Sequence, residues 1–229
     1  MSDWVSFWDS KHSVYVNTRH LEAHYRRIAD DLLRYVPEGG VVLDYGCGEA
    51  RSHDRIAAVA GRLMLCDAAP GVRAALVQRF SANNRIEVDT PEDLADLPSG
   101  EVDLIVMHSV TQYLSSGEFD RTLALFRHLI QPGGTVVLGD VIPPGVSPVT
   151  DAKALLQFAA QHGFLMGAVA GLARTAVSNY ARLRSTLGLA RYTEAQMIEK
   201  LADAGFSAQR APRNIGHNAA RMTFIARPD

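Results

Sequence analysis

One nonapeptide near the start of the chain limits the fold more than any other segment. Residues 41–49, Val-Val-Leu-Asp-Tyr-Gly-Cys-Gly-Glu, begin as a short apolar run and break into a turn with two glycines. Such a run is typical of a strand buried on both faces of a parallel sheet. Glycines directly after it let the backbone approach a ligand with no Cβ in the way. The segment therefore predicts an α/β fold with a binding turn at the end of its first strand.

The charges around this turn indicate which ligand it suits. Asp44 and Glu49 flank Gly46, Cys47 and Gly48. Turns that bind phosphate gather an anion with backbone N–H groups and a helix N-terminus, so the two carboxylates would repel a pyrophosphate. A nucleoside with a cationic head fits better, and adenosine that carries an amino acid and a sulfonium has such a head.

Strand-like and helical runs alternate along the chain, which is the pattern of a parallel sheet with helices on both faces. We expect the last two strands to form an antiparallel pair. The predicted fold class is α/β, with a seven-stranded, doubly wound (Rossmann-like), mostly parallel sheet whose last strand is antiparallel. The strands are expected at residues 41–44, 62–66, 86–88, 102–107, 134–140, 207–212 and 220–226.

Two segments fall outside this alternation and are expected to cover a site, because ligands of open α/β sheets bind beyond the carboxyl ends of the strands. We predict one domain over residues 1–229, with an N-terminal helical cap (1–36), a ligand-binding core (37–143), a helical lid insertion (144–190) and a last helix with a hairpin (191–229). Apolar residues at helical spacing predict two lid helices, around residues 152–159 and 176–187.

Helix signals separate the strands. Ser115 with Glu118, and Thr193 with Gln196, have the spacing of a capping box at a helix N-terminus. The Pro-Gly-Gly run at residues 132–134 is expected to stop the helix that follows Ser115.

Composition excludes several function classes. The net charge of -2 at pH 7 and the lack of a basic block leave no electrostatic reason to expect nucleic acid. Only two cysteines, Cys47 and Cys66, occur, and no signal peptide is recognisable, which favours a reducing cytoplasm. The longest apolar stretch, residues 163–173, is shorter than the roughly 20 residues of a membrane span. We therefore expect a soluble, cytoplasmic protein.

Polar residues also follow the next predicted strands. Asp67 ends the second strand 23 positions after Asp44, close to the ~20-residue spacing at which an acid reaches a ribose hydroxyl. Alternatively, Asp67 simply begins a turn. The third strand is followed by the acids Glu92 and Asp93, and the fourth by the polar pair His108 and Ser109.

Together with the turn at residues 130–135, these landmarks resemble class I S-adenosylmethionine-dependent methyltransferases, in the family's order over about residues 41–140. The resemblance implies S-adenosyl-L-methionine as the cofactor of the core, with Asp44 near its amino group and Asp67 on its ribose. Either Glu92 or Asp93 would lie near the adenine, unless both belong to a solvated helix cap. The remaining implied cofactor contacts are Gly46, Cys47, Gly48, Ala68, His108 and Ser109.

The resemblance also implies in-line methyl transfer to a substrate nucleophile, in which placement contributes much of the catalysis. A general base is needed only if the nucleophile carries a proton. The candidate bases are His108, Tyr113 and Asp140; structural or substrate-shaping roles are the alternatives, with packing favoured for Tyr113.

Several other polar residues allow two interpretations of their role. His20 and His24 lie one helical turn apart, but with no third ligand evident we expect no metal site. Tyr15, Arg19 and His20 either fold over the cofactor or form solvated helix surface. Residues 214–218, followed by Arg221, either reach the substrate or make a hairpin turn at the sheet edge.

The lid gives the only indication of a substrate. Its apolar side chains either line a cavity for a hydrophobic small molecule or pack against the sheet or a second subunit; they are Phe158, Phe164, Leu165, Met166, Val169 and Leu172. Three arginines of the lid would meet an acidic group, namely Arg174, Arg182 and Arg184. Gly167 and Gly171 permit close helix packing, which leaves a homodimer through the lid open.

Two other functions stay open. A nicotinamide-dependent (NAD(P)) oxidoreductase shares the doubly wound sheet, but the acid that ends the first strand and Ala50 at the third glycine position disfavour it. A methyltransferase-like fold that lost its activity and serves as a binding subunit is the other alternative. The residues Asp44, Gly46, Gly48 and Asp67 argue against the latter.

Overall fold

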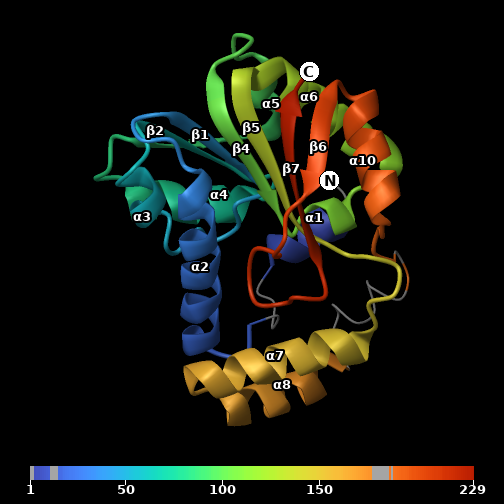
Figure 1. The fold of residues 1–229 in the computed structure, drawn as a ribbon. Coiled ribbons are helices and arrows are strands. Elements are labelled where there is room, and N and C mark those ends of the chain that lie inside the picture. The colour runs from blue at the N-terminus through green and yellow to red at the C-terminus, as the bar shows by residue number, and fades with distance from the viewer. Residues whose placement is uncertain (1–2, 11–14, 177–185, 187) are drawn as a thin grey trace.

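The computed structural model describes residues 3–10, 15–176, 186 and 188–229 of the chain. Its centre is a seven-stranded sheet with the order β3-β2-β1-β4-β5-β7-β6. Six strands run parallel, and β7 is antiparallel to both of its neighbours. The predicted fold class is therefore confirmed (Figure 1). The strands are β1 (Val41–Tyr45), β2 (Arg62–Cys66), β3 (Ile86–Asp89), β4 (Val102–His108), β5 (Ile130–Val141), β6 (Phe206–Arg210) and β7 (Met222–Pro228).

Helices cover both faces of this sheet because its strands carry apolar side chains on both sides. Leu43 and its neighbours on one face pack against α5, α6 and α10. Val42 and its neighbours on the other face pack against α2, α3 and α4. These helices are α2 (Thr18–Leu32), α3 (Asp54–Ala57), α4 (Pro70–Phe80), α5 (Pro91–Ala95), α6 (Ser116–Leu129) and α10 (Glu194–Asp203).

The expected strands lie within two residues of the observed ones, with one exception. The Pro-Gly-Gly run does not stop the helix: α6 ends earlier, at Leu129, and β5 begins at Ile130. Val102 pairs with Ile130 and Leu104 with Thr135, so residues 131–134 bulge out of the strand. Both expected capping boxes, at Ser115 and Thr193, are present.

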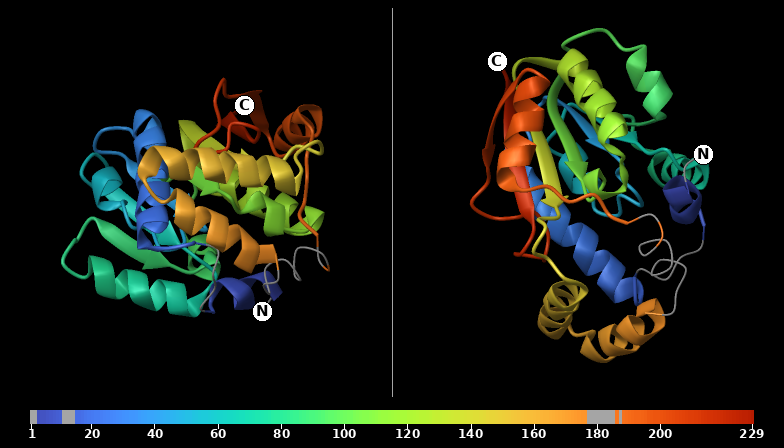
Figure 2. Two further views of the ribbon diagram at one scale, coloured as in Figure 1. Left: turned by 90° about the horizontal axis from the view of Figure 1, so that it is seen from below. Right: turned by 90° about the vertical axis from the view of Figure 1, so that its right-hand side faces the viewer.

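The remaining elements gather at one end of the sheet. The lid contains α7 (Pro148–His162) and α8 (Leu165–Ala176), and α2 extends away from the sheet to contact α7 (Figures 1 and 2). Helix α7 matches the first predicted lid helix, whereas the second prediction, around residues 176–187, lies almost entirely outside the described residues. Two elements were not predicted, the short helix α1 (Asp3–Trp8) and α8 itself. The described residues also form the 3-10 turns η1 (Leu33–Tyr35) and η2 (Thr111–Tyr113).

Two glycines let the lid pack closely against the N-terminal segment of its own chain. A Cβ on Gly171 would lie 2.0 Å from the side chain of Val16, and a Cβ on Gly167 would lie 2.8 Å from Asn17. Gly167 and Gly171 of α8 therefore serve a contact within the chain, against Val16 and Asn17. None of the helices described is long and apolar enough to cross a bilayer.

The packing of α6 predicts a large loss of stability for Phe126→Ala. Phe126 is fully buried, and its ring meets that of Tyr45, at the end of β1, edge-on at 5.3 Å. Removing a buried aromatic ring costs about 3–5 kcal/mol of unfolding free energy, to be measured by urea denaturation. Val149→Ala, at a side chain that is 77% exposed, should change it by less than about 0.5 kcal/mol. A loss below about 1 kcal/mol for Phe126→Ala would contradict the described core.

Candidate functional site

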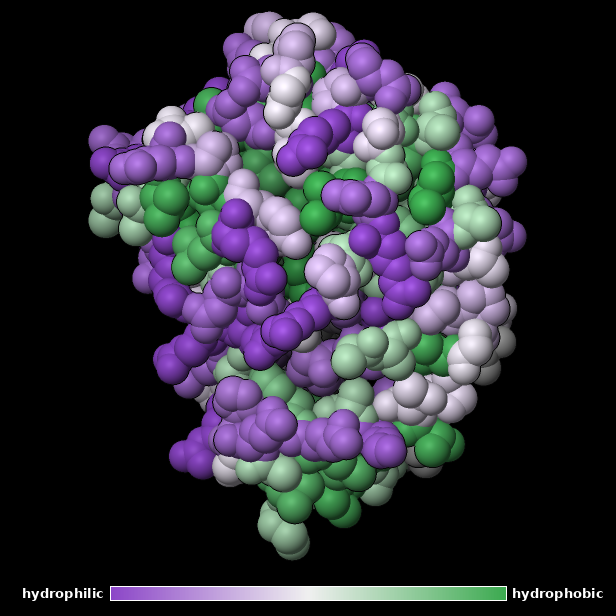
Figure 3. All heavy atoms as spheres, in the orientation of Figure 1, coloured by the Kyte–Doolittle hydropathy of each residue, from purple (hydrophilic) through white to green (hydrophobic). Residues whose placement is uncertain are grey.

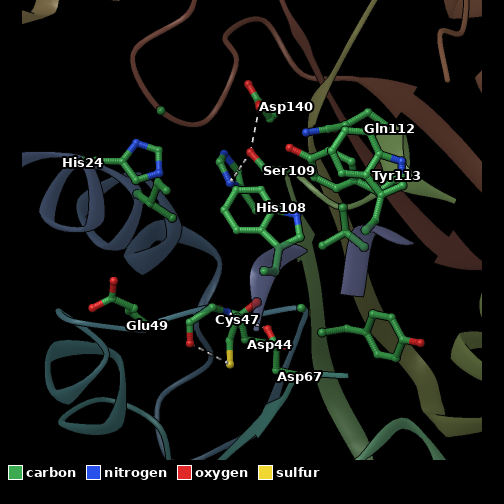
Figure 4. A pocket seen from close by; sticks show the side chains of 18 of the residues that line it. His24, Asp44, Cys47, Glu49, Asp67, His108, Ser109, Gln112, Tyr113 and Asp140 are labelled. Carbon is green, nitrogen blue, oxygen red and sulfur yellow. Dashed lines mark hydrogen bonds between the residues drawn. The ribbon is translucent and has the colours of Figure 1, made fainter. Parts of the chain in front are cut away.

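A cavity of about 1090 Å³ opens at the carboxyl ends of the parallel strands. Its wall combines the ends of β1, β2, β4 and β5 with α1, α2, α7 and the loop before β7 (Figure 4). This is where ligands of open α/β sheets bind. Its volume is at the upper end of the range for one drug-sized ligand, so it has room for a nucleoside and a second small molecule.

The turn after β1 forms the floor of the cavity. Gly46 and Gly48 have φ angles of 76° and 58°, in the left-handed region that glycine occupies without strain. A Cβ on Gly46 would lie 2.3 Å from Val110, and a Cβ on Gly48 would lie 2.7 Å from the Tyr25 hydroxyl. The turn therefore needs both glycines, for conformation and for space. Ala50, at the third glycine position, also has a positive φ, of 45°, and is completely buried.

Helix α2 holds this turn from above. The backbone N–H of Glu49 donates to the Tyr25 hydroxyl at 2.8 Å. The Tyr25 hydroxyl is also hydrogen-bonded to Tyr15, and burial raises the pKa of Tyr15 to about 12. Both phenols thus stay protonated. The sequence did not indicate this role of Tyr25, because helical spacing does not show what a buried hydroxyl contacts.

Asp67 lies at the end of β2, beside the turn. Its carboxylate accepts hydrogen bonds from the backbone N–H groups of Gly48, at 3.0 Å, and Ala69, at 2.9 Å. Burial raises the pKa of Asp67, while these N–H groups and Arg73 act in the opposite direction. Asp67 and the adjacent Ala68 both line the cavity. The contact with Ala69 corresponds to the alternative in which Asp67 begins a turn. Through Gly48, Asp67 also stabilises the glycine turn, a role that the sequence did not indicate.

Asp44 is the last residue but one of β1 and lines the same part of the cavity, but it has a partner that the sequence did not reveal. The imidazole Nε2 of His53 lies 2.5 Å from the Asp44 carboxylate. Both side chains are buried. His53 stands just before α3, nine positions along the chain, where no motif marks it.

The acids after β3 lie away from the cavity. Glu92 and Asp93 are exposed, and Pro91 is the residue of this segment that reaches the wall. Asp93 forms a capping box with Thr90 at the start of α5, and its hydrogen bonds to Thr90 lower its pKa. The geometry of Asp93 corresponds to the helix-cap alternative.

His108, Ser109 and Asp140 are brought together on the opposite side of the cavity, as Figure 4 shows. The Ser109 hydroxyl donates to Asp140 at 2.7 Å and lies 3.1 Å from His108 Nδ1. His108 Nε2 lies 3.2 Å from the carbonyl oxygen of Ile215. Because a carbonyl only accepts, Nε2 carries a proton in this arrangement. The one hydroxyl proton of Ser109 goes to Asp140, so Ser109 has none left to donate to Nδ1 of His108.

Arg221 ties this region to the lid. Its guanidinium contacts Asp140, at 2.6 Å, and Asp151 of α7, at 3.1 Å. Burial raises the pKa of Asp140, but Arg221, His108 and Ser109 outweigh it and hold the pKa below its usual value. Asn218 also donates to Asp151. The loop before β7 thus reaches the cavity instead of lying at the sheet edge.

An aromatic patch closes the cavity beside η2. The ring of Tyr113 lies 4.6 Å from that of Trp4 and 5.6 Å from that of Trp8, both on α1. All three residues line the cavity. Tyr113 therefore contributes packing to the wall, whatever its hydroxyl does.

Three further histidines face the cavity and are uncharged at neutral pH. Burial lowers the pKa of His20 to about 4, and burial also lowers the pKa values of His24 and His217. His20 stacks on Phe164, and His217 stacks on Phe158. In the described part of the chain, no group of three His, Cys, Asp or Glu residues has the geometry to hold a metal ion.

Of the other residues that the sequence suggested for the site, some line the cavity and some do not. Arg19 donates to the carbonyl oxygen of Gly163 and does not line the main cavity, whereas Tyr15 and His20 do. In the lid, Leu172 reaches the cavity, while Phe158 and Phe164 pack with Ala159 and Ala168. Leu165, Met166 and Val169 of α8 are exposed. Hydrophobic surface gathers at the lower end of the molecule in Figure 3, where Figure 1 shows α8. Arg174 is exposed, and Arg182 and Arg184 lie outside the described residues.

Comparison with protein families supports the interpretation of the core. Residues 42–134 match the family described as Methyltransferase domain. The core of this chain is similar to that family. The match covers β1 to the bulge in β5, which includes the turn, Asp67 and the end of β4. No curated protein sequence matches the chain.

Solved structures show that the fold extends beyond the methyltransferase core. DhpI in complex with SAH is 15% identical with a TM-score of 0.62, and the match covers 98% of this chain and 94% of DhpI. The N-methyltransferase NodS from Bradyrhizobium japonicum WM9, in complex with S-adenosyl-l-homocysteine, is 17% identical with a TM-score of 0.60, over 98% and 95% of the two chains. A protein from the complex with the Haloferax volcanii Trm112 methyltransferase activator is 13% identical with a TM-score of 0.63, over 100% and 98%. The cap and lid segments thus fall within the matched fold.

The Arg221 network predicts that Arg221→Met is strongly destabilising. The variant leaves the Asp140 carboxylate buried without its guanidinium partner, which costs about 3–5 kcal/mol. Urea denaturation at pH 7 measures the loss. Arg227→Met, which replaces an exposed arginine of β7, should be nearly neutral, and equal stability of the two variants would refute the role of Arg221.

The neutral histidines predict that stability falls as the pH drops from about 6.5 toward 4. Over this range the unfolded chain binds a proton on each imidazole, while the folded chain leaves His20, His24 and His217 uncharged, so unfolding becomes more favourable. Denaturant midpoints measured from pH 7.5 to 4.5 give the slope. His20→Phe should make the slope shallower, since it removes one such group and keeps the ring against Phe164. An unchanged slope would show that His20 does not remain neutral in the fold.

Proposed function

We propose that this protein is an S-adenosylmethionine-dependent methyltransferase that acts on a small, hydrophobic molecule by in-line methyl transfer. The observation that carries the proposal is the acidic turn in a methyltransferase-family core. Asp44, Glu49 and Asp67 all line the end of the cavity beside the turn. This charge disfavours a dinucleotide pyrophosphate and suits a sulfonium nucleoside with an amino group.

The residues around the turn fit this cofactor. The glycine turn offers a shallow backbone cradle where added Cβ atoms would collide with Val110 and Tyr25. Asp67 would receive the ribose hydroxyls, because each of its oxygens accepts a single N–H and keeps a second acceptor position. Asp44 would face the amino group, with Cys47, Ala68 and the backbone of the turn against the nucleoside. Glu92 and Asp93 would approach the adenine only if α5 shifted.

The acceptor would bind between the turn and the lid. There the wall is formed by aromatic and neutral imidazole rings, notably Trp4, Trp8, Tyr113, His24 and His217. Such a wall suits a hydrophobic molecule with a few hydrogen-bonding groups. The lid and α1 would exclude water from it.

The cofactor, when bound, supplies a methyl group on a sulfonium, and the chain's own residues place the acceptor in line with it. His108, Ser109 and Asp140 form one hydrogen-bonded group at the acceptor end, which would orient the acceptor. For an acceptor that carries a proton, His108 and Asp140 are the candidate bases. Both cysteines, Cys47 and Cys66, are free and buried, which supports the expectation of a cytoplasmic protein. The protein would work alone, as a homodimer or with an activator subunit. A similar fold occurs in a complex with the Trm112 activator, which supports a test for such a partner.

Calorimetric titration with S-adenosylhomocysteine and with NAD+ tests the proposal against the oxidoreductase. We expect saturable binding of S-adenosylhomocysteine and none of NAD+. Asp67→Ala should weaken that binding about a hundredfold or more, because two hydrogen bonds to a charged group are lost, while circular dichroism shows a folded chain. Asp96→Ala, at an exposed acid outside the cavity, is the control. Wild-type affinity in Asp67→Ala would overturn the site assignment.

A labelled methyl group separates an active enzyme from an inactive binding subunit. The protein is incubated with methyl-labelled S-adenosylmethionine and a small-molecule extract, and label in the extract is measured. Transfer above that of Asp67→Ala supports the proposal. Cofactor binding without any transfer would favour the inactive alternative.

A further inference from the structure

The pair formed by Asp44 and His53 is a feature that the methyltransferase motif alone does not explain. His53 is 1% exposed and Asp44 is 5% exposed, and the His53 Nε2 lies 2.5 Å from the Asp44 carboxylate. The backbone of His53 is fixed as well. Its N–H donates to the carbonyl oxygen of Ala50, and its carbonyl oxygen accepts from the N–H of Ala57, the last residue of α3. The imidazole of His53 is therefore held in a fixed position against the Asp44 carboxylate.

The second ring nitrogen shows which form of the imidazole this is. His53 Nδ1 is buried and has no hydrogen-bond partner among the residues that the structure describes. A protonated ring would place a charged N–H there without an acceptor, which costs far more than a bare lone pair. The neutral form with its proton on Nε2 satisfies the contact to Asp44. In that form His53 donates one hydrogen bond and cancels none of the carboxylate's charge.

We infer that His53 is a positioning residue, which holds the Asp44 carboxylate toward the cavity as the receptor for the cationic amino group of the nucleoside ligand. This inference depends on the proposed function and extends it to one named contact. One Asp44 oxygen is tied to His53, so the carboxylate cannot rotate freely. A fixed carboxylate with its full negative charge binds an ammonium better than a mobile one, because less freedom is lost on binding.

The experiment compares two ligands that differ at the relevant group. S-adenosylhomocysteine carries the amino acid part, and 5′-methylthioadenosine lacks it. Calorimetry is done on the wild-type chain and on His53→Ala, His53→Gln and His53→Asn. His53→Ala should weaken S-adenosylhomocysteine binding about tenfold, the effect of one hydrogen bond to a charged group, and leave 5′-methylthioadenosine binding unchanged.

The two amides provide the decisive control. The glutamine amide nitrogen lies at about the same reach along the side chain as Nε2, so His53→Gln should restore most of the affinity. The shorter His53→Asn cannot reach Asp44 and should remain weak. In an Asp44→Asn background, His53→Ala should have no additional effect on S-adenosylhomocysteine binding. His128→Ala, which removes a histidine bonded to the carbonyl of Leu97 far from this site, serves as the neutral comparison.

The possible failures are distinguishable. If His53→Ala weakens both ligands equally, or neither, or if Asn rescues as well as Gln, the positioning role is overturned while the proposed function stands. Should His53→Ala fail to fold, the Gln and Asn variants, which keep a polar side chain, decide between these outcomes. A wild-type chain that binds neither ligand overturns the proposed function itself.

Discussion

Strand β1 stops at Tyr45 because the chain must turn left-handed at Gly46, and the site depends on how this turn is held. The N–H groups of Gly46 and Cys47 both donate to the carbonyl oxygen of Cys66, at the end of β2. Asp67 accepts from Gly48, and Tyr25 accepts from Glu49. One turn therefore couples two strands of the sheet to the N-terminal helix α2, and a ligand at the turn would contact all of them.

The cavity above the turn divides into two electrostatic environments. Asp44 and Asp67 make one end acidic, where Glu49 also lies but is paired with Arg51. Imidazoles without charge and aromatic rings form much of the other end. The excess negative charge at the acceptor end is partly neutralised, because Arg221 pairs with Asp140 and Asp151. This arrangement supports the proposal of a cationic nucleoside at the turn and a weakly polar molecule beneath the lid. The ion pairs of Arg221, which are partly buried, also link α7 to the sheet.

Local patterns were sufficient to predict the sheet. Buried parallel strands, glycine turns and capping boxes each depend on residues that are close together in the sequence. The positions of Asp44 and Asp67 beside the turn followed from the same rule, since both end a strand. Contacts between distant segments were not predictable in this way. His53 behind Asp44 and Asp151 near Arg221 depend on how α3 and the lid fold back onto the sheet. The bulge at residues 131–134 was missed because Pro-Gly-Gly also fits a simple helix stop, and α8 because its glycines disfavour a helix until Val16 and Asn17 pack against them.

A crystal structure of the protein with S-adenosylhomocysteine tests the central claim most directly, which is that the acidic end of this cavity receives a nucleoside with an amino group. The account predicts ribose hydroxyls on Asp67 and the ligand's amino nitrogen within hydrogen-bond distance of the Asp44 oxygen that His53 leaves open. A nucleoside bound elsewhere, or a ligand whose amino group points away from Asp44 toward the lid, would contradict it.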